Sequence, residues 1–211
     1  MPSDSSPDAD LLARSAEGDK EALRELFSRY RDRLKRMVHL RLNRRLQGRV
    51  DDSDVVQEAY LNISQKLPEY AREPKLPLFL WLRHMTGLKL AEIHRRHLGT
   101  QARDADREVS LHRGGLPLAD SASLAAQLMG KLTTPSQAAI KAEQRIFVQE
   151  ALNSMDPIDR EVLALKHFEQ LSTSEIAEVL GLSKAGAGSR YLRAIKRMRE
   201  ILERIPGFRE L

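Results

Sequence analysis

The sequence predicts an all-α protein made of two small helical domains joined by a flexible linker, the second domain being a helix-turn-helix. Three observations support this prediction. Leu, Ala, Glu and Arg dominate a composition with only 5% aromatic residues, which favours helices over sheets. Apolar residues recur at spacings of three and four over most of the chain. A stretch rich in glycine, proline and small polar residues interrupts this pattern at 99–133.

The bulk composition narrows the class of protein further. With 211 residues, 41% of them hydrophobic, the chain can form the cores of two small domains, and its net charge of +5 weakly favours a polyanionic partner. It has no cysteine, which excludes disulfides and thiolate zinc sites. The N-terminus is polar and acidic, unlike a signal peptide, and no apolar run approaches the roughly 20 residues that span a bilayer. We therefore expect a cytoplasmic protein without membrane insertion.

The N-terminal domain is expected over 9–98, after a disordered start at 1–8 that is rich in Pro, Ser and Asp. A helical pattern runs from Ala9 to about Leu46, and a turn at Gly18-Asp19 separates a short first helix from a longer second one. The strongly basic stretch from Arg29 to Arg49 is either a solvated face or a contact with a partner.

The next two helices of this domain are bounded by acids, prolines and a glycine. A helix opens at Asp51-Asp52 and is predicted to end at Pro68, because proline cannot donate the helical hydrogen bond. A loop over 69–77 follows and contains two prolines. A long helix then runs from about Leu78 to His97 and stops before Gly99.

The linker is expected over 99–133, with one short helical piece near 122–129. The C-terminal domain follows at 134–211, and helix-start signals recur within it. These signals are Thr134-Pro135-Ser136-Gln137, Asp156-Pro157, and Ser172 with Glu175.

The last part of the C-terminal domain has the pattern of a DNA-binding helix-turn-helix. A short apolar-faced helix begins at Ser172, Gly181 allows the tight turn, and Ser183 caps a longer basic helix. The basic side chains of that helix are Lys184, Arg190, Arg193, Lys196, Arg197 and Arg199. An ordinary helical hairpin with a solvated basic face is the alternative, which three successive helix starts make less favourable.

The helix over 51–67 has one apolar face and one polar face that contains a leucine. The polar face consists of Asp54, Gln57, Glu58 and Leu61, with Gln65 further along the helix. A leucine between carboxylates indicates a surface that docks on a basic protein partner.

The helix over 78–97 begins with aromatic residues and ends with basic ones. Its candidate DNA-contacting residues are Trp81, Arg83, His84, Lys89, Arg95 and Arg96. Bases that leave a duplex stack on aromatic faces, while basic residues hold the backbone. Trp81 is either such a platform or a core residue, and both interpretations stay open at this point.

The sequence argues against a catalytic site and against a metal-binding site. Asp51 and Asp52 are explained as helix-start residues favoured by the helix dipole. His94 and His97, with Glu92, have the spacing of metal ligands, but no further ligand is evident and arginine neighbours would repel a cation. No glycine-rich phosphate loop and no nucleophile–base pattern is present. We expect no enzyme activity, no cofactor and no metal.

In order along the chain, these motifs resemble the sigma factors of bacterial RNA polymerase. The motifs are Asp54-Val-Val-Gln-Glu58, Trp81-Leu82, Arg95-Arg96, and Pro157-Ile-Asp-Arg-Glu-Val162 followed by the helix-turn-helix. The resemblance covers 9–98 and 134–205 and is to the extracytoplasmic-function (ECF) branch, which keeps two DNA-binding domains. The amino-acid sequence around Trp81 and in the linker resembles that of family members from planctomycete-type bacteria.

The resemblance implies a role for each surface. The polar face of the helix over 51–67 would bind the clamp helices of RNA polymerase core. The loop over 69–78 would hold a base flipped out of the promoter's minus-ten element, and the helix from Trp81 to Arg96 would face the opening DNA. The minus-thirty-five element would be read by Lys184, Ser189, Arg190, Arg193, Lys196 and Arg197. The linker would thread toward the polymerase active centre, and an anti-sigma factor is implied as a partner.

The chain departs from the family pattern at Gly87-Leu88, where an arginine–asparagine pair is frequent, and at Gly186 and Gly188 in the recognition helix. Family-style base contacts at these positions, and the promoter sequence, are therefore not transferred. Two other functions stay open at this stage. One is a helix-turn-helix repressor or activator that does not bind core polymerase, which would leave the surface around Asp54 unexplained. The other is an RNA- or ribosome-associated scaffold.

Overall fold

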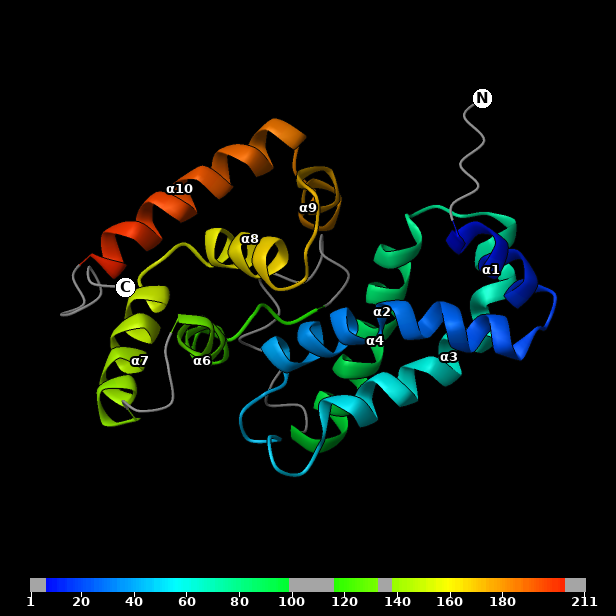
Figure 1. Cartoon of the computed structure of the whole chain (residues 1–211), viewed down its shortest axis with the longest axis horizontal. Coiled ribbons are helices and arrows are strands. Elements are labelled where there is room, and N and C mark those ends of the chain that lie inside the picture. The colour runs from blue at the N-terminus through cyan, green and yellow to red at the C-terminus, as the bar shows by residue number, and fades with distance from the viewer. Residues whose placement is uncertain (1–6, 99–115, 133–137, 204–211) are drawn as a thin grey trace. The chain divides into compact units, whose positions relative to one another are not determined.

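The computed structural model of the chain describes residues 7–98, 116–132 and 138–203, and in these parts it is all-α with no strand (Figure 1). The chain forms two compact units: unit 1 comprises 1–38 and 44–116, and unit 2 comprises 39–43 and 117–211. Among the described helices, none combines the length and hydrophobicity that crossing a bilayer requires. The predicted fold class is confirmed.

Unit 1 is built from the first four helices and a core drawn from all of them. The helices are α1 (Pro7–Ala16), α2 (Lys20–Arg41, in unit 1 up to Val38), α3 (Asp52–Arg72) and α4 (Leu78–Leu98). The predicted turn between the first two is present: Gly18 has a φ of 100°, and the Asp19 carboxylate accepts from the Ala22 amide at 3.0 Å. Only 1–6 of the expected disordered start lie outside the described residues, because α1 already begins at Pro7.

The end of α3 differs from the prediction. The helix continues through Pro68 to Arg72 and does not stop there. Tyr70 explains the extension, since its ring is buried and stacks on Trp81 with centroids 4.4 Å apart, and its hydroxyl donates to the Leu76 carbonyl at 2.8 Å. These tertiary contacts offset the hydrogen bond that the proline cannot donate.

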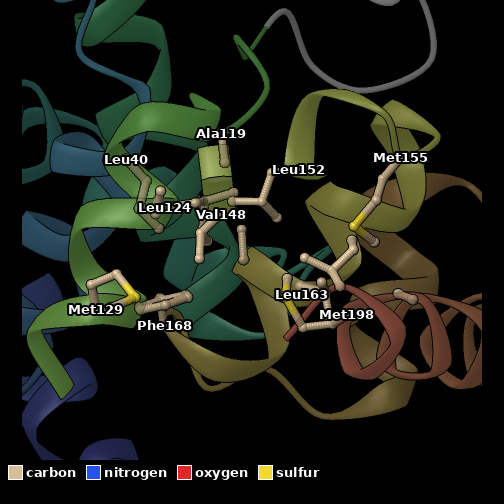
Figure 2. Close-up of a cluster of buried hydrophobic side chains, with 14 residues drawn as sticks. Leu40, Ala119, Leu124, Met129, Val148, Leu152, Met155, Leu163, Phe168 and Met198 are labelled. Atoms are coloured by element: carbon tan, nitrogen blue, oxygen red, sulfur yellow. The ribbon is translucent and has the colours of Figure 1, made fainter. Parts of the chain in front are cut away.

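Unit 2 contains the remaining described helices (Figure 1), and its core draws on most of them. They are α6 (Ser121–Leu132), α7 (Ala138–Asn153), α8 (Pro157–His167), α9 (Thr173–Leu180) and α10 (Lys184–Leu202). Figure 2 shows side chains such as Leu124, Leu152 and Phe168 gathered in one interior. Leu40, from the 39–43 segment of this unit, belongs to the same cluster.

The second half of the predicted linker is structured. Residues 99–115 and 133 lie outside the described residues, but 121–132 form α6, which packs against α7. Leu124, Ala125 and Met129 are buried in the unit 2 core. The expected short helical piece near 122–129 is therefore a core element of the second unit, and the description of 121–132 as linker was wrong.

The helix-turn-helix is present as predicted. Ser172 and Glu175 form the reciprocal capping box of α9, and Gly181 takes the left-handed conformation with a φ of 62°. Ser183 then caps α10, accepting from the Gly186 amide at 3.0 Å. Figure 1 shows α10 beginning near α9 and running beside α8, and it packs against both of these helices and against α7.

A buried charge cluster inside unit 2 was not expected. Arg41, from the basic stretch, has a fully buried side chain that forms ion pairs with Glu161 and, at 2.6 Å, with Glu169. The second carboxylate oxygen of Glu161 accepts from the Ala119 amide at 2.8 Å. Arg41 is thus neither a solvated residue nor a surface contact, and both interpretations of the basic stretch fail at this position.

Candidate nucleic-acid interface

The polar face of α3 is exposed along the predicted surface. Asp54 and Gln57 are solvent-exposed, and Leu61 has 59% of its surface exposed, on the side opposite the buried face. Glu58 is half-exposed, with the Lys89 ammonium 3.8 Å from its carboxylate. A single exposed leucine is common on protein surfaces, so Leu61 gains meaning only from the acidic and polar groups that surround it on this face.

A cavity of about 280 Å³ lies between the end of α3, the loop that follows, and the start of α4. Trp81 stacks on Tyr70 with an interplanar angle of 17° and lines this cavity, so it is both a packing residue and part of an accessible wall. Lys66 and Lys75 line the same cavity. An aromatic wall beside two ammonium groups can receive an unstacked base and the phosphate attached to it.

His84 also lines this cavity, and its pKa is held below the ordinary value. Burial is the main cause, because it disfavours the charged imidazolium, and the positive charges of Arg83 and Lys66 add to it. The imidazole is therefore neutral at pH 7, where it can exchange hydrogen bonds with a base edge but offers no charge to a phosphate.

The remaining basic residues of α4 divide into two groups. Arg95 and Arg96 are exposed, as a DNA-facing role requires. Arg83, only 4% exposed, lies in the interior, and Lys89 is largely covered, with its ammonium 2.8 Å from Glu92. The expectation that Arg83 faces DNA is contradicted by its burial, and Lys89 is held by Glu58 and Glu92.

The glycine at position 87 has a packing reason. A Cβ atom built on Gly87 would lie 2.0 Å from Cδ2 of Leu116, so only glycine allows that leucine to lie against α4. The departure from the family's usual arginine therefore makes room for Leu116 of the same unit.

The residues of α10 that were predicted to contact the minus-thirty-five element differ in their surroundings. Lys184, Ser189, Arg193 and Lys196 are exposed. Arg190 has a side chain that is only 24% exposed and lies 2.7 Å from Asp159 of α8. Arg197 is half-exposed and pairs with Glu200 of its own helix at 3.2 Å.

The metal-site alternative gains nothing from the described residues. They contain no group of three or more His, Cys, Asp or Glu side chains that could hold an ion. His94 is buried whereas His97 is exposed, so the two are not presented as one pair of surface ligands.

Comparison with known proteins relates the chain to sigma factors. The family model described as Sigma-70, region 4 matches residues 148–198, from the second half of α7 to near the end of α10. ECF RNA polymerase sigma factor SigD of Mycobacterium tuberculosis is 26% identical over 190 residues, which cover 90% of this chain and 81% of SigD. ECF RNA polymerase sigma factor ShbA of Streptomyces griseus is 26% identical over 198 residues, which cover 92% of this chain and 94% of ShbA.

These matches support a sigma factor that is similar, over about nine-tenths of its length, to members of the ECF branch. It directs RNA polymerase to promoters, and its family consists of transcription initiation factors that are not enzymes. The similarity to SigD and ShbA spans both units, which the repressor and scaffold alternatives do not explain. The fold has a further parallel in the solved structure of CnrH in complex with the cytosolic domain of CnrY. That likeness has a TM-score of 0.57 at 22% identity and covers 94% of this chain and 98% of CnrH.

Sequence reasoning missed several groups of this sigma factor. Arg41 looked like any other member of a basic stretch, and no periodicity assigns it two glutamates more than a hundred residues away. Asp159 was read only as part of a family motif, although it faces α10 in space. The sequence offered one sign that the Asp159 carboxylate has a defined place. Asp159 lies in the first turn of α8, three residues after the Asp156 cap.

Proposed function

We propose that this sigma factor acts in the cytoplasm, binds RNA polymerase core through α3, and contacts promoter DNA through α4 and α10. The observation that supports the DNA-reading part most is the capped helix α10, which presents Arg193 and Lys196 to solvent within the region matched by the sigma family model. A basic helix of a helix-turn-helix places such side chains in the major groove and along phosphates.

The polymerase-binding face consists of Asp54, Gln57, Glu58 and Leu61. The face is acidic with an apolar centre, so it fits a basic partner helix that also offers an apolar side chain. Lys89 lies close enough to Glu58 to orient its carboxylate without covering Leu61, which stays 59% exposed.

The minus-ten surface comprises the cavity at the start of α4 and the basic end of that helix. In this proposal a base leaving the duplex enters beside Trp81, and neutral His84 exchanges hydrogen bonds with its edge. Arg95 and Arg96 hold the backbone further along. Buried Arg83 and engaged Lys89 support α4 in this proposal without touching DNA.

The minus-thirty-five surface comprises Lys184, Ser189, Arg193, Lys196 and Arg197. Arg193 is the residue that would read a base edge, because it is exposed in the middle of α10. Lys196 and Arg197 lie later on the helix, where they would meet phosphates. Arg190 is treated separately below, since acidic neighbours hold its side chain.

Two finer assignments also belong to the proposal. The residues around Trp81 and in the linker support a planctomycete-like variant of the branch. The solved relative CnrH is bound to the cytosolic domain of CnrY. By resemblance we propose that an anti-sigma factor also binds this chain.

The test of the core-binding face uses the full chain. Asp54→Ala combined with Glu58→Ala should weaken co-purification with core polymerase and lower transcription from a promoter with a pre-opened fork. Thermal unfolding should change little, since these side chains lie on the exposed face. Asp10→Ala combined with Glu17→Ala removes the same charge from other exposed sites of unit 1 and serves as the control. Unchanged core binding by the first variant, with an earlier melt, would show that the carboxylates are structural.

A further inference from the structure

Two acidic residues at the start of α8 lie against the basic helix α10 inside unit 2. Asp156 is the N-cap of α8, and Asp159 lies in its first turn. The Nη1 atom of Arg190 is 2.7 Å from Oδ1 of Asp159 and 3.4 Å from Oδ1 of Asp156. The other oxygen of Asp159 lies 3.7 Å from Nε of Arg193. One carboxylate thus contacts two neighbouring arginines of the recognition helix.

The two arginines differ sharply in exposure. The Arg190 side chain is 24% exposed and the Asp159 side chain 14%, so this pair is largely shielded from water. The Arg193 side chain is 60% exposed. Shielding strengthens the first ion pair, whereas the second is an open contact that leaves most of the guanidinium accessible.

Asp156 reinforces the arrangement as a charged group. Burial raises the pKa of its carboxyl, but the Ile158 amide and the Arg190 guanidinium outweigh this effect, and the pKa is lowered overall. Its carboxylate is therefore ionised at neutral pH. Two carboxylates at the start of α8 thus hold the Nη1 group of Arg190.

The contact between Asp159 and Arg193 involves the inner end of the guanidinium. The distance of 3.7 Å is to Nε, which is next to the aliphatic stem, and 60% of the Arg193 side chain stays exposed. A bidentate contact with guanine uses two guanidinium N–H groups aimed at O6 and N7 in the major groove. A carboxylate beside Nε biases the direction of the side chain, and the 60% exposure leaves guanidinium N–H groups accessible to a base.

We propose that Asp159 is a specificity-determining positioning residue of this sigma factor: it holds Arg190 off the DNA backbone and orients Arg193 toward a guanine edge of the upstream promoter element. This inference rests on the proposed role of α10 in reading that element. It assigns Arg190 to the packing between α8 and α10, and it leaves Arg193 as the base reader. Without the carboxylate, Arg190 becomes one more mobile cation beside DNA, which favours phosphates of any sequence.

The experiment uses the full chain assembled with RNA polymerase core. The probe is a pool of promoter duplexes randomised over the upstream element, and bound fragments are sequenced at several salt concentrations. Asp159→Asn keeps the size of the side chain and removes its charge. We expect discrimination at the selected upstream position to fall about fivefold, the lower end of what one bidentate contact contributes. We also expect the salt dependence to steepen by about one phosphate contact.

Two comparisons keep the proposal separate from a loss of stability. Glu150→Gln removes one negative charge from an exposed site on α7 of the same unit and should leave the selection unchanged. Asp159→Asn added to Arg193→Ala should cause no further loss of discrimination, because the reader it orients is already absent. A structural defect would lower all binding together and shift the thermal unfolding of unit 2.

The outcomes distinguish this proposal from the proposed function. If the wild-type complex selects an upstream sequence, Arg193→Ala flattens it, and Asp159→Asn behaves like the wild type in both selection and salt dependence, the positioning role is overturned while α10 remains the reader. If Arg193→Ala and Lys196→Ala also leave the selection unchanged, the DNA-reading role of α10 itself fails, and the role of Asp159 fails with it.

Discussion

Replacing Arg41 by alanine should destabilise unit 2 far more than its position in a surface-like basic stretch suggests. Its side chain is 0% exposed, and those of Glu161 and Glu169 are 4% and 0% exposed. Removal of the guanidinium leaves two carboxylates in the same interior without the cation that now lies between them. Removing one partner from a buried ion pair costs about 3–5 kcal/mol, because the remaining charge stays desolvated.

That loss is large against the total stability of a small domain, about 5–15 kcal/mol. Trp81 is the only tryptophan and belongs to unit 1, so its fluorescence follows that unit. Circular dichroism follows the helices of both units. In a urea titration, Arg41→Ala should move the circular-dichroism transition to lower urea by the equivalent of about 3–5 kcal/mol for unit 2. The fluorescence transition should move less.

The matched control is Arg31→Ala, which removes the same charge from an exposed site on α2. Surface changes of this kind stay within about 0.5 kcal/mol. Adding Glu161→Gln and Glu169→Gln to the Arg41 variant should restore part of the loss, since glutamine keeps an oxygen for the Ala119 amide but no charge. If Arg41→Ala shifts stability no more than Arg31→Ala does, the cluster contributes nothing measurable and the argument from its burial is wrong.

Three further predictions follow from the packing and from one pKa. Gly87→Ala should lower the stability of unit 1 by about 1–3 kcal/mol in urea unfolding, because the added Cβ would overlap Leu116. Adding Leu116→Ala to this variant should recover part of the lost stability. Equal stability of Gly87→Ala and wild type would contradict the tight fit of Leu116 against Gly87. His84 binds fewer protons in the folded than in the unfolded state just below its ordinary pKa of 6.5, so its contribution to stability should be present above that pH and be lost as the pH falls below it. Melting temperatures measured across this range should fall less steeply in His84→Gln, and parallel curves would rule the coupling out. In limited proteolysis, bonds within 121–132 should resist cleavage because Leu124 and its neighbours are buried, and early cuts there would contradict the place of α6 in the core.

Much of the fold was predictable because its signals are local. Helix caps such as Ser172 and Ser183 accept hydrogen bonds from amides two or three residues away. Gly181 takes the left-handed backbone conformation that the turn after α9 requires. The helix-turn-helix therefore follows from neighbouring residues alone. The exposed face of α3 was equally predictable, since the position of Leu61 opposite an apolar stripe depends only on helical geometry.

What only the tertiary structure decided concerns contacts between residues far apart in the chain. Periodicity cannot show that a helix continues through Pro68, because the stabilising contact of Tyr70 with Trp81 comes from the next helix. It cannot separate Arg41 and Arg190 from the exposed arginines beside them either. An arginine on a helix is a solvated cation, a DNA reader or a buried partner according to which carboxylates the rest of the chain brings within 3 Å. The sequence alone determined most of the helices and the class of protein, whereas packing decided where α3 ends and which of the arginines are buried against carboxylates.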